Sequence, residues 1–230
     1  NIRSGDLDVM ELPEPLALPG ELLIANVASL ISAGTEKSIM GLAKKSLIGK
    51  ARSRPDHVRR VLEKVRNEGL FETLRQVRAK LDEPMSMGYS SAGVVLACGH
   101  GVSGYKVGDR VASNGPHAGV VTVPVNLCAQ IPEGVTYDHA SFAVVGSIAM
   151  QGVRLSKVSL GESALVIGLG LVGQLAVMIL KAAGVRVIAT DLDPEKCALA
   201  LKLGADVASS NLSEHQTKTF SNDYGVDAVL

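Results

Sequence analysis

The sequence of 230 residues contains no tryptophan, and aromatic residues make up only 3% of it. Few side chains are therefore available to stack on nucleic-acid bases. The formal net charge is zero, so the chain as a whole offers no electrostatic attraction to phosphate backbones. Because 47% of the residues are apolar, the composition also excludes a largely disordered chain. We expect a globular protein that binds neither nucleic acid nor membranes.

Cysteine is equally scarce. Cys98, Cys128 and Cys197 lie far apart and form no Cys-x-x-Cys pair. This spacing excludes a disulfide framework and a zinc finger, and it favours a reducing, cytoplasmic location. The amino terminus is polar and acidic, unlike a secretory signal peptide. The sequence lacks an initiator methionine and ends in the strand-like YGVDAVL, so we expect a piece of a longer polypeptide.

One apolar run is long enough to span a bilayer. Residues 164–185 contain only two polar side chains, those of Gln174 and Lys181. However, three glycines cluster near the start of the run, and a polar strand-like segment follows it. We therefore interpret the run as a buried strand that passes through a glycine turn into a buried helix.

The rest of the chain predicts two kinds of sheet. Short strands between Gly, Pro and Asn-Gly turns, such as ELLIANVASLI, SSAGVVLACG and GVVTVPVN, predict a small barrel or sandwich. Beyond residue 159, strands alternate with helices, which predicts a parallel, doubly wound sheet. Residues 37–80 instead have apolar residues at helical spacing, and they hold 13 of the 23 Lys and Arg with only four acids. They form a basic helical insert in an otherwise acidic chain.

The glycines of the apolar run match the GxGxxG pattern. Gly168, Leu169, Gly170, Leu171, Val172 and Gly173 follow a predicted strand and open a predicted helix. Asp191 ends the next strand, 21 residues past Gly170. In this context the first glycine permits the turn, the second lets the backbone approach a pyrophosphate, and the third allows close helix packing.

We predict that these residues bind a dinucleotide. The helix N-terminus would face the phosphates, and Asp191 would accept hydrogen bonds from the ribose hydroxyls and repel a 2′-phosphate. This favours NAD(H) over NADP(H). The alternative is a structural glycine turn in a sheet that binds no nucleotide.

Several motifs together resemble the medium-chain dehydrogenase/reductase superfamily, the relatives of zinc-type alcohol dehydrogenases. GVVLACGHGVSGYKVGDRVA resembles their glycine-rich barrel segment, and ISAGTE occupies the place of their Cys-Gly-Ser/Thr-Asp stretch. VIGLGLVG and ATDLDPEKCALALKLGAD resemble their coenzyme turn and second strand.

The resemblance implies an α/β fold in three parts. These are a GroES-like β-barrel substrate domain over 1–135 with the basic helical insert at about 37–83, a connecting helical segment over 136–158, and a partial Rossmann domain over 159–230. Read this way, the chain ends inside its first coenzyme sheet.

With its long insert, the chain is most similar to the amino-terminal half of bi-domain oxidoreductases. This similarity implies a second oxidoreductase module in the parent protein and a small-molecule substrate, with a nucleotide-linked sugar as one candidate. A homodimer is compatible with the superfamily. The insert itself has two interpretations: a lid that attracts an anionic substrate, or a solvated helical pair that docks on an acidic neighbour.

The catalytic zinc of the superfamily is not expected here. The resemblance places its ligands at Ala33, Tyr89 and about Val144, none of which carries a thiolate, imidazole or carboxylate. The four-cysteine structural zinc lobe is also missing from the sequence. We therefore predict no metal site.

Other side chains remain as candidate catalytic groups. The resemblance places Thr35 at the proton-relaying hydroxyl, Tyr89 at the former ligand position, His117 on a loop bordering the cleft, and Ser147 near the nicotinamide. The plainer alternatives are that Tyr89 fills the space of the ligand, Thr35 serves a turn, and His117 has an ordinary structural role.

Two functions follow. The first is a zinc-independent NAD(H)-dependent oxidoreductase acting on a carbonyl, enone or sugar-type substrate, since the nicotinamide carries the difficult chemistry. The alternative is a non-catalytic nucleotide-binding module for regulation or assembly. An open position for Tyr89 and Thr35 would favour the first, and a packed phenol the second.

Overall fold

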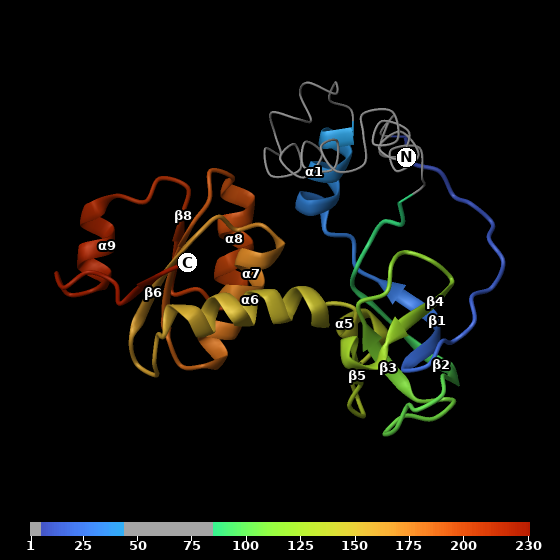
Figure 1. Cartoon of the computed structure of the whole chain (residues 1–230). Coiled ribbons are helices and arrows are strands. Elements are labelled where there is room, and N and C mark those ends of the chain that lie inside the picture. Colours follow the sequence, from blue (N-terminus) through green and yellow to red (C-terminus); the bar gives the residue numbers. More distant parts are fainter. Residues whose placement is uncertain (1–5, 44–84) are drawn as a thin grey trace, which may run out of the picture.

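The chain forms two sheets joined by a helical segment (Figure 1). The computed structural model describes residues 6–43 and 85–230. Most of the predicted basic insert, including both of its predicted helices, therefore lies outside the described residues. The first sheet is antiparallel and the second parallel. This agrees with the prediction from short strands between turns in the first part and strands alternating with helices in the second.

The antiparallel sheet contains every strand predicted before residue 135. Its strands are β1 (Glu21–Ser29), β2 (Ser91–Cys98), β3 (Arg110–Ser113), β4 (Val120–Pro124) and β5 (Cys128–Gln130), with a 3-10 turn η1 (Val125–Leu127) before β5. Their spatial order is β4-β1-β2-β3-β5. Alternate residues point inward and form a closely packed aliphatic core, which includes Leu22, Ile24, Val95 and Val111.

Close contact between β1 and β2 depends on a glycine. A Cβ atom added at Gly93 would lie 2.1 Å from the carbonyl oxygen of Ala25 on β1. The register between the two strands shifts nearby, between Asn26 and Ala28. Gly93 therefore lets the two backbones approach at a point where any side chain would push them apart.

Helix α1 (Ala33–Ala43) begins earlier than the predicted insert boundary near residue 37. Its start is determined by Glu36, whose carboxylate accepts a hydrogen bond from the N–H of Ser32 at 2.9 Å, just before the helix. An acidic residue in the first turn also interacts favourably with the helix dipole. Thr35 therefore lies in a helical first turn.

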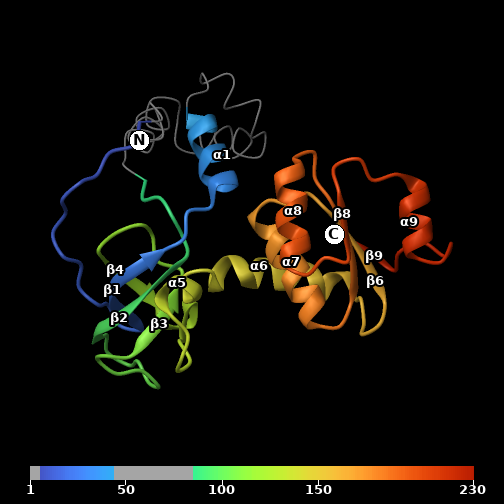
Figure 2. The same cartoon turned by 180° about the vertical axis from the view of Figure 1, so that it is seen from behind.

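The connecting segment contains α5 (Tyr137–Ala140) and α6 (Ala143–Ser156). Thr136 caps α5 by accepting a hydrogen bond from the N–H of His139, and Lys157 ends α6 in a left-handed conformation. In Figures 1 and 2, α6 runs from the antiparallel sheet to the parallel one, where it packs against α7.

The parallel sheet has the order β8-β7-β6-β9. Its elements in chain order are β6 (Ser163–Ile167), α7 (Leu171–Ala182), β7 (Arg186–Thr190), α8 (Pro194–Lys202), β8 (Val207–Ser209), α9 (Glu214–Phe220) and β9 (Ala228–Val229). Buried residues of α7, including Val177 and Leu180, pack on Val187 of β7 in one apolar core. The long apolar run at 164–185 is thus β6, a turn and α7. Within the described residues, no helix has the length and apolarity needed to cross a bilayer.

Helix α9 has no counterpart among the predicted elements. It is short and polar, so it lacks the apolar periodicity that marks a helix in sequence. Its start nevertheless carries a capping box, in which Ser213 accepts from the N–H of Gln216 and the Gln216 side chain accepts from the N–H of Ser213.

The same substitution at two glycines should have opposite effects. We expect Gly93→Ala to lower the free energy of unfolding by about 1–3 kcal/mol, because its Cβ forces β1 and β2 apart. Gly146 lies inside α6 with open space around its Cβ position, so Gly146→Ala should raise that free energy by roughly 0.5–1 kcal/mol. Urea unfolding followed by circular dichroism checks both. A change of the same sign in the two variants would contradict this account of β1 and β2.

Candidate functional site

The predicted coenzyme turn joins β6 to α7. Gly168 has a φ of +93°, a conformation that side-chain-bearing residues rarely adopt, and its N–H donates to the carbonyl of Thr190 on β7 at 2.8 Å. Gly170 is the N-cap of α7 and offers no capping side chain. Val172 in the first turn is exposed. The start of α7 is therefore a free helix N-terminus, which suits an anionic ligand.

The third glycine of the pattern has a separate role. A Cβ added at Gly173 would lie only 2.0 Å from the carbonyl oxygen of Gly168. The first turn of α7 can pass this close to the preceding loop only without a side chain there. The side chain of Leu169, between the first two glycines, points into the core and is 1% exposed.

Asp191 follows β7 directly and faces the turn. One carboxylate oxygen, Oδ2, accepts from the N–H of Leu169 at 2.7 Å, and Oδ1 accepts from the N–H of Asp193 at 2.9 Å. These two backbone hydrogen bonds, first that from Asp193 and then that from Leu169, hold the pKa of Asp191 below its usual value. Lys196 Nζ lies 3.5 Å from Oδ1. The predicted acid and the predicted turn are thus in direct contact.

Two residues near this site were not predicted. Lys196 stands in the first turns of α8, five residues after Asp191, where its side chain reaches back to the carboxylate. Gln174 is buried below the turn and bonds to the carbonyls of Leu169 and Lys196. A sequence signal exists for Gln174, since it is a polar residue within an otherwise apolar helical run.

The predicted catalytic hydroxyls also come together, although 54 residues separate them in sequence. The Tyr89 hydroxyl donates to Thr35 Oγ1 at 3.3 Å. The Ser32 hydroxyl donates to the same atom, also at 3.3 Å. Thr35 is exposed and Tyr89 is half-buried. The phenol is therefore accessible and already held in a hydrogen-bonded group.

His117 joins this group through Glu36. Its Nε2 lies 3.2 Å from Glu36 Oε1, the same oxygen that accepts from the Ser32 N–H, and its Nδ1 lies 2.9 Å from Ser29 Oγ. The Glu36 carboxylate is mostly buried, and the Ser32 N–H and the His117 imidazole both lie within hydrogen-bonding distance of it. One carboxylate thus connects the start of α1 to the loop that carries His117.

Two further contacts hold His117 in place. The Asn26 amide donates to the carbonyls of Pro116 and Ala118, which flank the histidine in sequence. Gly88, which precedes Tyr89, has a φ of +85°, and a Cβ there would lie 2.6 Å from the imidazole ring. The missing side chain of Gly88 leaves the space that the imidazole occupies.

Ser147 is the predicted residue that the structure does not bring to the turn. It lies exposed on α6, and its hydroxyl donates to the carbonyl of Val144 in the same helix at 2.7 Å. No contact recorded among the described residues links it to Gly168–Gly173. Its predicted place beside the coenzyme remains a prediction.

The residues at the three zinc-ligand positions do not suit a zinc ion. Ala33 and Val144 end in methyl groups, and the Tyr89 phenol is hydrogen-bonded to Thr35. Nearby, His117 and Glu36 are ligand-type side chains, but they are paired with each other. In residues 6–43 and 85–230, no group of three or more His, Cys, Asp or Glu side chains is placed to hold a metal ion.

A separate hollow of about 720 Å³ lies on the antiparallel sheet. It is lined by the turn at 104–110 and by Gln130, Ile131 and Glu133. Its lining carries both charge signs, with Lys106 and Arg110 opposed by Asp109 and Glu133. It contains none of the predicted site residues.

Two protein-family models match the chain. The alcohol dehydrogenase GroES-like domain matches residues 69–166, and the zinc-binding dehydrogenase domain matches residues 172–230. The second match falls on the parallel sheet and includes none of the three ligand positions considered above. Together the two models span more than half of the chain.

Named relatives and a solved structure agree with these matches. The D-guloside 3-dehydrogenase of Escherichia coli (strain K12) is 31% identical over 152 residues, covering 63% of this chain and 43% of the relative. A mycocerosic acid synthase-like polyketide synthase of Mycobacterium tuberculosis (strain ATCC 25618 / H37Rv) is 35% identical over 153 residues, covering 63% of this chain and 7% of the synthase. A mycobacterial protein solved in complex with NADPH is 27% identical, with a TM-score of 0.69.

The chain covers only part of each of these proteins. It aligns with less than half of the curated dehydrogenase, and its 96% coverage in the structural match corresponds to 61% of the mycobacterial chain. The first model spans β2 to β5 of the antiparallel sheet, and the second spans most of the parallel sheet: the antiparallel sheet is the GroES-like domain and the parallel sheet is the Rossmann-like domain. From the two models, the relatives and the shared fold we conclude that the chain belongs to the medium-chain dehydrogenase/reductase superfamily.

Proposed function

We propose that the protein is a zinc-independent, NAD(H)-dependent oxidoreductase module. The observation that carries this proposal is the position of Asp191, whose carboxylate lies against the glycine turn and accepts from the N–H of Leu169. An acid held there can accept hydrogen bonds from ribose hydroxyls while the free N-terminus of α7 faces the phosphates. Its negative charge opposes a 2′-phosphate, which supports NAD(H) as the coenzyme.

The nicotinamide, when bound, supplies the hydride acceptor or donor. The protein would supply hydrogen bonds. We assign Tyr89 as the donor to the oxygen on which negative charge develops. Its one hydroxyl hydrogen, which Thr35 accepts in the absence of substrate, would turn to the substrate oxygen. The Thr35 hydroxyl would then donate to the phenol oxygen and hold it in position. His117, through Glu36, would keep the start of α1 and therefore Thr35 in place. Ser147 would border the nicotinamide.

The substrate class follows from the absent ligands. Because Ala33, Tyr89 and Val144 do not hold a Lewis acid, the Tyr89 phenol would have to polarise the substrate oxygen, and a phenol polarises it less strongly than zinc does. A hydrogen bond suffices for carbonyls and enones that are already activated, and for a sugar carbon that the site positions well. A carbonyl, enone or sugar-type substrate is the proposal, with a nucleotide-linked sugar as one candidate.

The proposal extends to the organisation of the parent protein. We place the substrate domain at 1–135, the connecting helices at 136–158 and the coenzyme domain from residue 159. A cytoplasmic location is supported by the three free cysteines. The match to one part of a large polyketide synthase supports a larger parent protein, for which we propose a second oxidoreductase module. A homodimer is part of the same proposal.

A non-catalytic nucleotide-binding module is the second candidate. The unsuitable residues at the zinc-ligand positions favour it, because they remove the family's Lewis acid. Against it stand the exposed Thr35 and the half-buried Tyr89, since a phenol that merely filled the space of a ligand would be packed shut.

Calorimetric titration with NADH and NADPH, with bound metal assayed on the same sample, tests the coenzyme. We expect NADH to bind at least about tenfold more tightly than NADPH, because the Asp191 carboxylate repels a 2′-phosphate. Asp191→Ser should reduce or reverse this preference. Binding of neither coenzyme would leave the turn as a scaffold, and stoichiometric zinc would contradict the metal-free site.

Substitution of the two hydroxyls tests the catalytic assignment. We expect Tyr89→Phe to lower kcat by roughly 100-fold and Thr35→Val by less, because the first removes the proton donor and the second only its partner. The NADH dissociation constant should stay unchanged in both. NADH oxidation is measured with a soluble quinone, an enone and a nucleotide-linked sugar in turn. Tyr224→Phe, at an exposed site, is the control, and an equal kcat in Tyr89→Phe and Tyr224→Phe would refute the role of Tyr89.

A further inference from the structure

Gln174 is a buried polar side chain in a helix whose other buried residues are apolar. It is 7% exposed and lies among Ala176, Val177 and the rest of the core beneath the coenzyme turn. Burial of an amide is unfavourable unless the amide is hydrogen-bonded. Leucine or methionine would pack at this position without burying a polar group. The presence of glutamine there therefore needs an explanation, which its hydrogen bonds supply.

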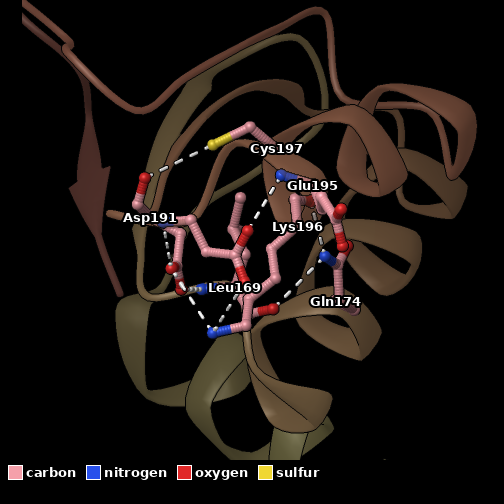
Figure 3. A network of polar contacts seen from close by, with 7 residues as sticks. Leu169, Gln174, Asp191, Glu195, Lys196 and Cys197 are labelled. Carbon is pink, nitrogen blue, oxygen red and sulfur yellow. Dashed lines mark hydrogen bonds and ion pairs between the residues drawn. The ribbon is translucent and has the colours of Figure 1, made fainter.

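The amide of Gln174 joins two segments that surround the coenzyme turn. Its Nε2 donates to the carbonyl of Leu169 at 3.3 Å and to the carbonyl of Lys196 at 2.8 Å (Figure 3). Both neighbours are carbonyl acceptors, so the NH₂ end must face them. Its Oε1 is buried and has no hydrogen-bond partner among the described residues. The two donated bonds therefore determine the orientation of this side chain.

These bonds close a ring of contacts around the turn. Leu169 donates its N–H to Asp191, and the Lys196 ammonium approaches the same carboxylate at 3.5 Å. Gln174 completes the ring by donating to the carbonyls of both residues, as Figure 3 shows. The peptide groups on both sides of Leu169 are thereby fixed, one through its N–H and the other through its carbonyl.

We infer that Gln174 is a positioning residue that determines how strongly the site discriminates between NADH and NADPH. This inference rests on the proposed coenzyme function. For a 2′-phosphate to enter, the Asp191 carboxylate has to move away from the ribose position, and the first turns of α8 have to shift so that Lys196 can pair with the phosphate. Gln174 resists that shift because it ties the Lys196 backbone to the glycine turn.

The variant that tests this inference has to remove the two hydrogen bonds of Gln174 without leaving a cavity. Gln174→Met keeps the length of the side chain, removes both donated bonds and also removes the unpartnered Oε1, so the core should remain well packed. The matched control is Val177→Ala, which removes buried volume from the same helix without touching the ring. Val177→Ala should lower Tm more than Gln174→Met does.

The experiment measures dissociation constants for NADH and NADPH by calorimetry, and Tm without coenzyme, in the full chain and both variants. We expect Gln174→Met to weaken NADH binding by about tenfold and NADPH binding by less, so that the preference for NADH falls. Amide hydrogen exchange at Leu169, measured without coenzyme, should become faster in Gln174→Met than in Val177→Ala, although Val177→Ala has the lower Tm. Val177→Ala should keep the preference of the parent protein.

Three results would overturn this inference. An unchanged NADH preference in Gln174→Met, or an equal loss of preference in Val177→Ala, would show that Gln174 only stabilises the fold, while the proposed coenzyme function would stand. Binding of neither coenzyme by the parent protein would overturn the coenzyme function and the inference together. The Leu169 exchange rate would then still report whether the ring holds the turn.

Discussion

The hydrogen bond from the Leu169 N–H to Asp191 is the interaction on which the coenzyme side of the molecule depends. It connects the end of β7 to the loop that follows β6, two points 22 residues apart in the chain. Parallel strands place these loops at the same edge of the sheet, but pairing of the strands alone does not determine how the glycine loop turns there. The carboxylate does so by accepting from a backbone donor of the loop. The group expected to meet the ribose is therefore also the group that shapes the phosphate turn.

Glu36 has the corresponding role on the antiparallel sheet. A single oxygen of its carboxylate meets the N–H of Ser32 and the imidazole of His117. Removal of this carboxylate would free the start of α1 and would leave the His117 ring, within the described part of the chain, with its hydrogen bond to Ser29 but without its pairing to Glu36. Both candidate sites thus follow one physical rule. In each, a partly buried carboxylate accepts from backbone N–H groups that would otherwise lack a partner there.

The sequence predicts most of the elements because their signals are local. Alternating apolar residues give the strands of the antiparallel sheet, and the glycine pattern with Asp191 gives the turn and its acid. The pairings were harder to predict. The resemblance assigns both Tyr89 and Thr35 to the former catalytic site, but no sequence pattern predicts the hydrogen bond between them, since 54 residues separate them. The hydrogen bonds from His117 to Glu36 and from Gln174 to Lys196 depend on how loops and helices pack in three dimensions. The early start of α1 was missed because the carboxylate that starts it looks, in sequence, like part of a loop.

The unsuitable zinc-ligand positions change the demands on the rest of the site. A zinc ion polarises a substrate oxygen through its charge. A neutral phenol at the same position is effective only when its orientation is maintained, because a hydrogen bond weakens steeply as its angle worsens. The contacts around Tyr89 provide that orientation: Thr35 accepts from the hydroxyl, Glu36 anchors the turn that carries Thr35, and Gly88 gives His117 room to pair with Glu36. These contacts support the proposed role of Tyr89 over that of a side chain that only fills the position of a ligand.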